Sequence, residues 1–298
     1  MDIKRTKSEK VFNVFNICFM VLLIIVTLYP LWYVLIASLS NPISVARGAV
    51  RLLPDNIELD AYRNVFTQTQ WFDGREINVI WTAYGNTIIY AVVGTAINMI
   101  FTILAAYPLS KMRLAGRKII TIFFLFFMWF SAGMVPTYFN FQRLGLLDTR
   151  MAVLLAFVIN PFFIILMRTF FENIPNEMEE SARMDGASDW VILTRIYLPL
   201  STAAIATLTM FYFVGRWNAF FWAMLLLRSP TLVPLQVVLR RLIVEAQFAL
   251  EHIDIADNIS VQTLIYATIV VAVIPMLAFY PFVQKFFVRG IMVGAIKG

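Results

Sequence analysis

Residues 80–109 read IWTAYGNTIIYAVVGTAINMIFTILAAYPL, thirty residues without one charged side chain. A helix needs about 20 predominantly apolar residues to cross the roughly 30 Å hydrocarbon core of a bilayer, so this run is long enough to span it. Five other runs have the same apolar character and a similar length: 12–39, 118–140, 151–171, 199–227 and 262–284. The sequence therefore predicts an all-α, polytopic membrane protein with six transmembrane helices.

The composition supports this class. Of 298 residues, 60% are hydrophobic and only 14% are charged, so a large soluble protein would lack the polar residues to cover its surface. We expect one integral-membrane domain over 12–298, preceded by a short N-terminal segment. The polar stretches between the runs are two outside segments and one long inside loop: 40–79, 228–261 and 172–198. His252 and Cys18 are the sole residues of their types, and neither predicts a metal site or an internal disulfide.

Lys and Arg residues set the expected orientation, because cytoplasmic loops of membrane proteins are enriched in them. They are concentrated in the segments on the N-terminal side of the membrane, including 111–118 with its four basic residues. Both termini and the segment 1–11 are therefore expected in the cytoplasm, and the resemblance described below implies a bacterial cell membrane (inner or plasma). The net charge of +6 follows from this topology, and no nucleic-acid partner is needed to explain it.

The six runs contain no Asp or Glu, although ion-coupled carriers usually keep such groups within the membrane. The chain also lacks the GxxxxGK[ST] phosphate loop of nucleotide hydrolysis. With a single His and no acids in the runs, it offers no clustered residues for a membrane-embedded enzyme. We expect neither a catalytic site nor a cofactor bound by this chain, so a partner must supply the energy for any uphill transport.

The stretch 179–189, EESARMDGASD, is unusually polar for this chain. Pro175 and the acids after it suit the start of a helix, and Gly186 suits a break. Ser188 or Asp189 can cap a second helix that would stop at Pro199. The pattern predicts two short helices at an angle, with small residues at their corner. Such a corner lets another backbone approach closely.

The spacing of this loop resembles the signature E-A-A-x-x-x-G-x(9)-I-x-L-P of ABC importer permeases, with Ser181 in place of the middle Ala. The segments 86–87, 104–107, 145–149, 217–220 and 287–298 are similar to carbohydrate-uptake permeases related to the maltose transporter, in particular to their six-helix G-type subunit. The segments 107–111, 131–138 and 234–236 look like the subgroup that imports oligosaccharides of complex polysaccharides, such as alginate or rhamnogalacturonan.

The resemblance implies a type I importer fold whose loop 172–198 forms cytoplasmic coupling helices in a cleft of an ATPase. The residues implied in that contact are Glu180, Ser181, Ala182, Met184, Asp185, Gly186, Ala187, Ile196, Leu198 and Pro199. Three tail residues would lie near the ATPases: Gly290, Gly294 and Lys297. The implied partners are a homologous second permease, two ATPases that bind ATP and Mg²⁺, an extracytoplasmic solute-binding protein and the lipid bilayer. Permeases for a simple sugar or glycerol phosphate, and a carrier acting alone, are the alternatives.

Sugars are bound by aromatic faces and hydrogen-bonding side chains. The segment 215–222 combines aromatic and hydrogen-bonding side chains, so a substrate pathway could include Arg216, Trp217, Asn218 and Phe220. Three residues of the same types elsewhere in the chain are further candidates: Tyr138, Asn140 and Asn160. Arg216 would suit an acidic sugar, or carbonyl groups or the second permease could satisfy it within the membrane. For Trp217 and Phe220, packing between helices is the alternative role. In the maltose-type family, the sister subunit makes most of the substrate contacts.

Overall fold

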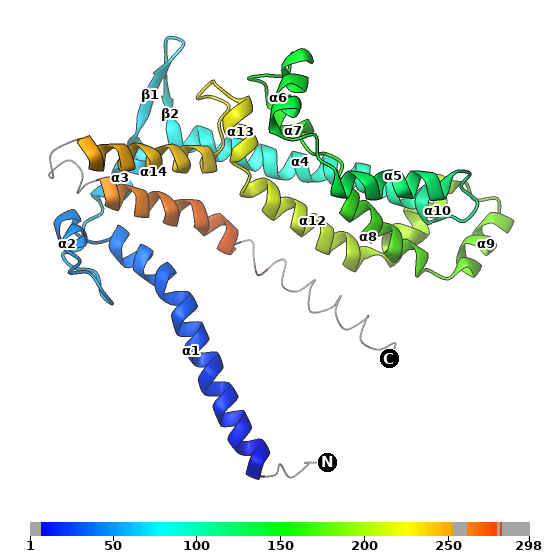
Figure 1. Ribbon diagram of the computed structural model, residues 1–298, viewed down its shortest axis with the longest axis horizontal. Helices are drawn as coiled ribbons and strands as arrows, with labels where there is room; N and C mark the ends of the chain where they lie inside the picture. Colours follow the sequence, from blue (N-terminus) through cyan, green and yellow to red (C-terminus); the bar gives the residue numbers. More distant parts are fainter. Residues whose placement is uncertain (1–6, 253–260, 279–280, 282–298) are drawn as a thin grey trace. The chain divides into compact units, whose positions relative to one another are not determined.

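The structure is a computed structural model that describes residues 7–252, 261–278 and 281 (Figure 1). Contacts within the chain gather in two compact units. The first unit comprises 1–68 and 241–274, and the second comprises 69–240 and 275–298. The expected single domain over 12–298 stays a prediction.

The first unit begins with α1 (Lys7–Ser38), whose most apolar stretch is not buried in the chain. Its last turn packs Ile36 and Ala37 against Val45 and Val50, next to the short helix α2 (Pro42–Ala46). The helix α3 (Asp60–Thr67) follows, and the Tyr62 hydroxyl lies 2.7 Å from the Ser38 hydroxyl. The expected outside segment 40–79 is therefore partly helical.

The second unit opens with a β-hairpin of β1 (Thr69–Phe72) and β2 (Arg75–Asn78). The strands pair antiparallel, with Thr69 opposite Asn78. Asp73 and Gly74 connect them with φ angles of +51° and +73°, which fits the two-residue Asp-Gly turn that suits a hairpin. The prediction of an all-α protein is wrong for these residues, because a left-handed Asp-Gly turn favours strand pairing over a helix.

The helix α4 (Val79–Ser110) coincides with the predicted run 80–109 and packs against α8 and α12 (Figure 1). Its buried face carries small and polar residues, whereas side chains such as Val92 and Phe101 are exposed. Small and polar residues are typical of contacts between helices in a membrane, where they allow close backbone approach. The Thr102 and Tyr212 hydroxyls, 2.7 Å apart, join α4 to α12 within this contact.

Two of the other expected spans are interrupted. The run 118–140 forms α5 (Arg117–Trp129) and α6 (Met134–Arg143), bent by 113° near Gly133, whose φ is +80°. The run 151–171 forms α7 (Arg150–Leu155) and α8 (Pro161–Glu172), because Pro161 cannot continue a helix from before it. Each of these two predicted runs is therefore divided into two helices, and the predicted spans themselves stay a prediction.

The fifth expected span, 199–227, is also divided. It contains α12 (Thr202–Trp217) and α13 (Phe221–Leu226), and the helical stretch Asp189–Leu200 meets α12 at 83°. By length and composition, the described residues hold three helices able to cross a membrane, or up to five if each bent pair is one span. The predicted count of six helices is therefore not tested.

The loop 172–198 is helical over most of its length. It holds α9 (Asn176–Met184), α10 (Asp189–Ile192) and a π-helix (Leu193–Tyr197), and α11 (Leu198–Leu200) follows. The second short helix was expected to stop at Pro199, but the helical path continues to Leu200. The remaining described helices are α14 (Leu235–His252), inside the expected outside segment 228–261, and Val261–Ala278.

Candidate functional site

The corner between α9 and α10 is a helix C-cap. The Gly186 amide donates to the Arg183 carbonyl (3.0 Å), and the Ala187 amide donates to the Ala182 carbonyl (2.9 Å). This pair of bonds is the Schellman motif, in which the residue at the Gly186 position adopts a left-handed conformation. The φ of Gly186 is +79°, which explains why glycine occupies the break.

The second helix is capped by Ser188, whose hydroxyl accepts from the Val191 amide at 3.4 Å. Of the two candidates left open by the sequence, Ser188 therefore caps α10. Asp189 has another role, because its carboxylate forms ion pairs with Arg113 and Arg183.

The residues predicted to contact an ATPase divide into two sets. Met184 is 89% exposed, and the other exposed residues of the set are Glu180, Ser181, Asp185, Gly186 and Pro199. The partly buried residues pack against the chain's own core, and they are Ala182, Ala187, Ile196 and Leu198. Ala182 and Ala187 therefore stabilise the corner through contacts within the chain, and their predicted contact with a partner stays a prediction. Trp190, 63% exposed, adds an apolar side chain to the outer surface.

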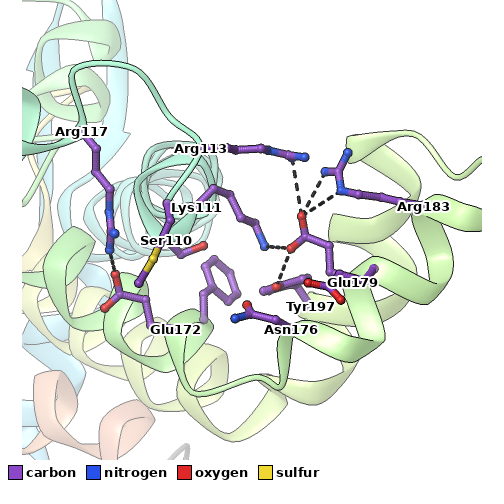
Figure 2. A pocket seen from close by; sticks show the side chains of 12 residues that line it. Ser110, Lys111, Arg113, Arg117, Glu172, Asn176, Glu179, Arg183 and Tyr197 are labelled. Atoms are coloured by element: carbon purple, nitrogen blue, oxygen red, sulfur yellow. Dashed lines mark hydrogen bonds and ion pairs between the residues drawn. The ribbon is translucent and has the colours of Figure 1, made fainter.

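The buried carboxylate of this loop belongs to Glu179, which is 9% exposed (Figure 2). Its Oε2 atom lies 2.5 Å from Lys111 Nζ and accepts a hydrogen bond from the Tyr197 hydroxyl at 2.8 Å. Its Oε1 atom accepts from Arg183 Nε at 3.1 Å and lies 3.6 Å from Arg113 Nη2. We call these residues, together with Asp189, the Glu179 cluster.

Lys111 brings α4 into the Glu179 cluster, because it directly follows the last residue of this helix and its amide donates to the Pro108 carbonyl. Its ammonium lies 3.4 Å from the ring centre of Tyr197 and 4.5 Å from that of Tyr107. A cation over aromatic faces gains electrostatic energy, most of all where water is excluded. Lys111 is 8% exposed, so its charge is held by one carboxylate and two rings.

The neighbouring cations lower the pKa values of Glu179 and Asp189. Burial alone would raise the pKa of Glu179, but hydrogen bonds from Lys111 and Tyr197 outweigh it and hold this pKa below its usual range. Desolvation alone would also raise the pKa of Asp189, but the hydrogen bonds from Arg183 and Arg113 outweigh it and lower this pKa. Both carboxylates are therefore ionised at neutral pH and offset two of the three surrounding positive charges.

A cavity of about 540 Å³ adjoins the Glu179 cluster (Figure 2). At its other side, Arg117 forms an ion pair with Glu172, and Arg168 Nε lies 2.8 Å from the same carboxylate. This second group ties α5 to α8, and Arg117 Nε also donates to the Leu109 carbonyl of α4 at 2.8 Å. Within the described residues, no hydrogen bond or ion pair joins this group to α9 or α10. Within the described part of the chain, no three His, Cys, Asp or Glu side chains are grouped to hold a metal ion.

Arg216 lies in a second polar site, within α12. Its Nη1 atom donates to the Val153 carbonyl (2.5 Å), and Nη2 donates to the Leu154 carbonyl (3.1 Å) and to Asn98 Oδ1 (2.7 Å). The two carbonyls belong to the last turn of α7, where helix carbonyls lack intrahelical partners and the helix dipole favours a cation. Gly94 of α4 makes room, since a Cβ there would lie 3.1 Å from Arg216 Nε. We call these groups the Arg216 cluster.

A cavity of about 560 Å³ lies beside the Arg216 cluster, and mainly apolar and aromatic side chains line it. Of the residues predicted for a substrate pathway, Arg216, Asn218, Phe220 and Asn160 line this cavity. Phe157, with a φ of +55°, also lines it, and its ring centre lies 5.2 Å from that of Trp222. A positive φ is rare for so bulky a residue and is held only by its surroundings.

The other predicted pathway residues lie elsewhere. Trp217 is 4% exposed and stacks against Phe213 with ring centres 6.0 Å apart, which is the packing alternative left open by the sequence. Tyr138 and Asn140 are on α6 and do not line the cavity. The tail residues Gly290, Gly294 and Lys297 lie outside the described residues.

The loop 227–235 is fixed by buried polar groups of α4 and by Asp148. Asp148 Oδ1 accepts from the amides of Arg228 and Ser229, both at 2.8 Å. Asn86 donates to the Thr231 and Val233 carbonyls at 2.8 and 3.1 Å. The sequence singled out 86–87 and 145–149 by resemblance, and the structure shows that both segments hold this loop.

The Glu179 cluster and Asn98 were not expected from the sequence. Glu179 and Arg183 are spaced as a helical i,i+4 pair, which was the available signal. The partners Lys111 and Tyr197 are distant along the chain, and Asn98 lies within an apolar run. The local sequence therefore does not predict that Lys111, Tyr197 and Asn98 belong to these clusters.

Comparisons with known proteins agree with this architecture. Residues 119–293 match the family described as binding-protein-dependent transport system inner membrane component. Protein LplC of Bacillus subtilis is 39% identical over 98% of this chain and 97% of its own. The polygalacturonan/rhamnogalacturonan transport system permease protein YtcP of the same organism is 36% identical, over 98% of this chain and 100% of its own.

Solved structures give the same result. A chain of a bacterial ABC transporter involved in the import of the acidic polysaccharide alginate superposes with a TM-score of 0.84. It is 39% identical and covers 96% of this chain and 99% of its own. A chain of a bacterial alginate ABC transporter in complex with an alginate pentasaccharide-bound periplasmic protein is 16% identical with a TM-score of 0.61, and it shares the fold.

These features define an integral membrane transport subunit rather than an enzyme. The chain belongs to the family of binding-protein-dependent transport system inner membrane components, the permease subunits of ABC importers.

Proposed function

We propose that this chain is the permease subunit of an ATP-driven importer that moves an acidic oligosaccharide across the inner membrane of a bacterium. The observation that carries this proposal is the match to the alginate transporter chain, at 39% identity over nearly the whole of both chains. YtcP, named for polygalacturonan and rhamnogalacturonan transport, supports the same class of substrate. Alginate, polygalacturonan and rhamnogalacturonan are all acidic polysaccharides that contain uronate units.

The proposal includes the partners of this subunit. A homologous second permease would complete the pathway, two cytoplasmic ATPases would bind ATP and Mg²⁺, and an extracytoplasmic solute-binding protein would deliver the substrate. The chain would cross the bilayer six times with both termini in the cytoplasm, so that loop 172–198 faces the ATPases. This orientation rests on the distribution of Lys and Arg.

The exposed set of loop 172–198 is the proposed contact with an ATPase. Glu180, Asp185 and Met184 stand on its outer surface, where their charges and apolar area are free to meet a partner. Ala182, Gly186 and Ala187 hold the corner that presents them. The tail residues Gly290, Gly294 and Lys297 are proposed to lie near the same ATPases.

The cavity beside the Arg216 cluster is the proposed place where this subunit meets the substrate. Phe220 and Trp222 offer aromatic faces, and Asn218 and Asn160 offer hydrogen bonds, as sugar-binding sites require. Arg216 directs its Nη atoms to protein acceptors, so its role is to shape the wall of the cavity. Recognition of the acidic groups would then fall mainly to the partner permease and the solute-binding protein.

The substrate is tested with the reconstituted four-subunit complex and its solute-binding protein in proteoliposomes. We expect oligogalacturonate or alginate oligosaccharides to bind that protein and to stimulate ATP hydrolysis, and neutral arabino-oligosaccharides and glycerol 3-phosphate to do neither. Stimulation by a neutral sugar or glycerol phosphate alone would contradict the acidic substrate. Uptake without any ATPase subunit would contradict the ABC importer itself.

The ATPase contact is tested separately with Glu180→Lys. This change should abolish copurification of the ATPases or reduce transport at least tenfold, because it reverses a charge on the exposed surface. Glu177→Lys is the matched control, since Glu177 is an exposed acid of the same helix outside the signature. Equal behaviour of both variants and the unchanged protein would contradict the proposed contact.

A further inference from the structure

The Glu179 cluster contains side chains from two segments far apart in the sequence. Lys111 and Arg113 belong to the loop after α4, whereas Glu179 and Arg183 belong to α9 (Figure 2). Asp189, at the start of α10, pairs with both arginines. The Lys111 and Glu179 side chains are both about nine-tenths buried. A contact between two buried, charged and hydrogen-bonded groups cannot slide without leaving a charge unpaired, so it resists relative movement of the two segments.

From this geometry we infer that the Lys111–Glu179 ion pair locks loop 172–198 to the inner end of α4, so that the two move as one body during transport. This inference rests on the proposed function, which makes loop 172–198 the receiver of motion from the ATPases. Lys111 and Glu179 are then positioning residues: they would contact neither nucleotide nor substrate, and they transmit the displacement of the loop.

The lock also has a defined target, because α4 is a single helix of 32 residues. At a rise of about 1.5 Å per residue, it is about 48 Å long, which exceeds the roughly 30 Å core of a bilayer. Lys111 follows its last residue, and near its other end Asn86, Thr87 and Tyr90 bind the backbone of loop 227–235. A displacement received at Glu179 is therefore delivered to α4, which reaches both the Arg216 cluster and that loop.

Other contacts of α9 and α10 with their surroundings would allow movement. Arg113 and Asp189 pair at the surface, with side chains 46% and 58% exposed, and water can replace such a bond at little cost. The apolar side chains that pack beside them have no fixed geometry comparable to a hydrogen bond. The Lys111–Glu179 pair, reinforced by the Tyr197 hydroxyl and ring, is the contact that sets the register between loop 172–198 and α4.

The experiment measures whether the two segments keep a fixed distance. Cys18, the one natural cysteine of the chain, is replaced by Ser, and Met112→Cys and Glu177→Cys introduce spin labels. Met112 is 89% exposed beside Lys111, and Glu177 is exposed on α9, so the labels report on both sides of the lock. Distances are recorded for the full complex in nanodiscs, without nucleotide and after trapping with ATP and vanadate.

When Lys111 and Glu179 are unchanged, we expect one narrow distribution of label-to-label distances that is the same without nucleotide and after trapping. In Lys111→Gln and in the double variant Lys111→Gln/Glu179→Gln, the distribution should broaden or shift after trapping, and stimulation of ATP hydrolysis by the solute-binding protein should fall several-fold. The double variant leaves no buried charge unpaired, so it keeps the test valid if the single variant does not fold. Arg117→Gln is the matched control, because it removes an ion pair beside the same cavity and a hydrogen bond to the Leu109 carbonyl of α4, but no bond to α9, and its distance distribution should match that of the unchanged protein.

A distance that changes with nucleotide in the unchanged protein would overturn the inference. So would a fixed distance in the double variant, or the same loosening in Arg117→Gln. Failure of the complex to bind the ATPases or to trap nucleotide would instead contradict the proposed function, and the two failures are therefore distinguishable.

Discussion

The Glu179 cluster and the Arg216 cluster both remove charge from water, but they compensate for it differently. At Glu179 the partners are opposite charges, one of them buried and the others close to the surface. At Arg216 the partners are neutral: two carbonyls at the end of α7 and the amide of Asn98. The first cluster joins the loop after α4 to α9 and α10, and the second joins α12 to α4 and α7.

This difference shows how one membrane chain can divide its polar interactions between two tasks. A buried ion pair cannot slide without leaving a charge unpaired, so it suits the proposed joint that transmits movement. Carbonyl dipoles at a helix end do not titrate, so they suit a site that must stay the same in every state. The predictions below test this contrast.

The largest effect is expected for Glu179→Gln. This change leaves the buried Lys111 ammonium without its carboxylate, and breaking one side of a buried pair typically costs about 3–5 kcal/mol. The melting temperature of the purified complex should fall clearly. Glu177→Gln, at an exposed position of the same helix, should stay within about 0.5 kcal/mol of the unchanged protein. Similar melting temperatures for both variants would show that the Glu179 cluster adds no stability.

Arg216→Gln should have the next largest effect, about 2–3 kcal/mol, because hydrogen bonds of a charged donor to the Val153 and Leu154 carbonyls are lost. Arg216→Lys should recover little of this loss, since one ammonium cannot replace the planar fork that bridges three acceptors. Thermal unfolding in detergent measures both variants. Full recovery by Lys would mean that the charge alone, and not the geometry of the guanidinium, holds the Arg216 cluster.

A smaller loss, about 1–2 kcal/mol, is expected for Gly186→Ala, because a residue with a Cβ is strained at a φ of +79°. The Schellman corner would open, and the spacing between α9 and α10 would loosen around the Glu179 cluster. Gly215→Ala is the control: Gly215 lies in the helix α12, and a Cβ there meets no atom within 4 Å. Its melting temperature should stay level or rise, and equal losses in both variants would contradict the role of the left-handed conformation.

Arg117→Gln should cost about 1 kcal/mol, because the Arg117–Glu172 pair is partly open to water and one further hydrogen bond, from Arg117 Nε to the Leu109 carbonyl, is lost. Arg168 stays beside Glu172 Oε1 and can still compensate for its charge. Differential scanning calorimetry of the purified complex measures this change. A loss as large as that of Glu179→Gln would show that burial does not separate the two ion pairs.

The smallest effect on stability is expected from a change of pH between about pH 8 and about pH 5. The pKa of Glu179 is lower in the folded chain than in the unfolded one, so its contribution to stability is full above the unfolded value and is lost as pH falls through the folded value. Stability should therefore be flat in this window and decline in more acidic buffer, less steeply in Glu179→Gln than in the unchanged protein. A decline that begins near neutral pH, or the same acid decline in both proteins, would contradict the lowered pKa.

Much of the fold could be predicted from the sequence. The runs 12–39 and 80–109 correspond to α1 and α4, because long apolar stretches have few alternatives to a membrane-spanning helix. The two short helices around Gly186 were also predictable, since a glycine break, a serine cap and a row of acids act locally. The hairpin 69–78 carries its own Asp-Gly signal, which the apolar runs outweighed in the prediction of an all-α chain.

The broken helices could not be predicted in the same way. Composition shows that 118–140 and 151–171 are apolar, but it does not show where a helix bends. The bend after α5 and the break before Pro161 leave backbone groups without helical partners, and such breaks are tolerated inside a membrane protein where other groups compensate. The Phe157 carbonyl, for example, accepts from Asn98 Nδ2 of α4 at 3.3 Å.

The sequence by itself determined that this chain is a membrane permease and which short loop has the signature of an ABC importer permease, and it predicts that partners supply the energy. Those properties follow from composition and local spacing, which are written along the chain. Tertiary structure alone decided that Glu179 rather than Glu180 is the buried acid, that Lys111 is its partner, and that carbonyls hold Arg216. Each of these depends on residues dozens of positions apart, and only packing brings their polar atoms within hydrogen-bonding distance.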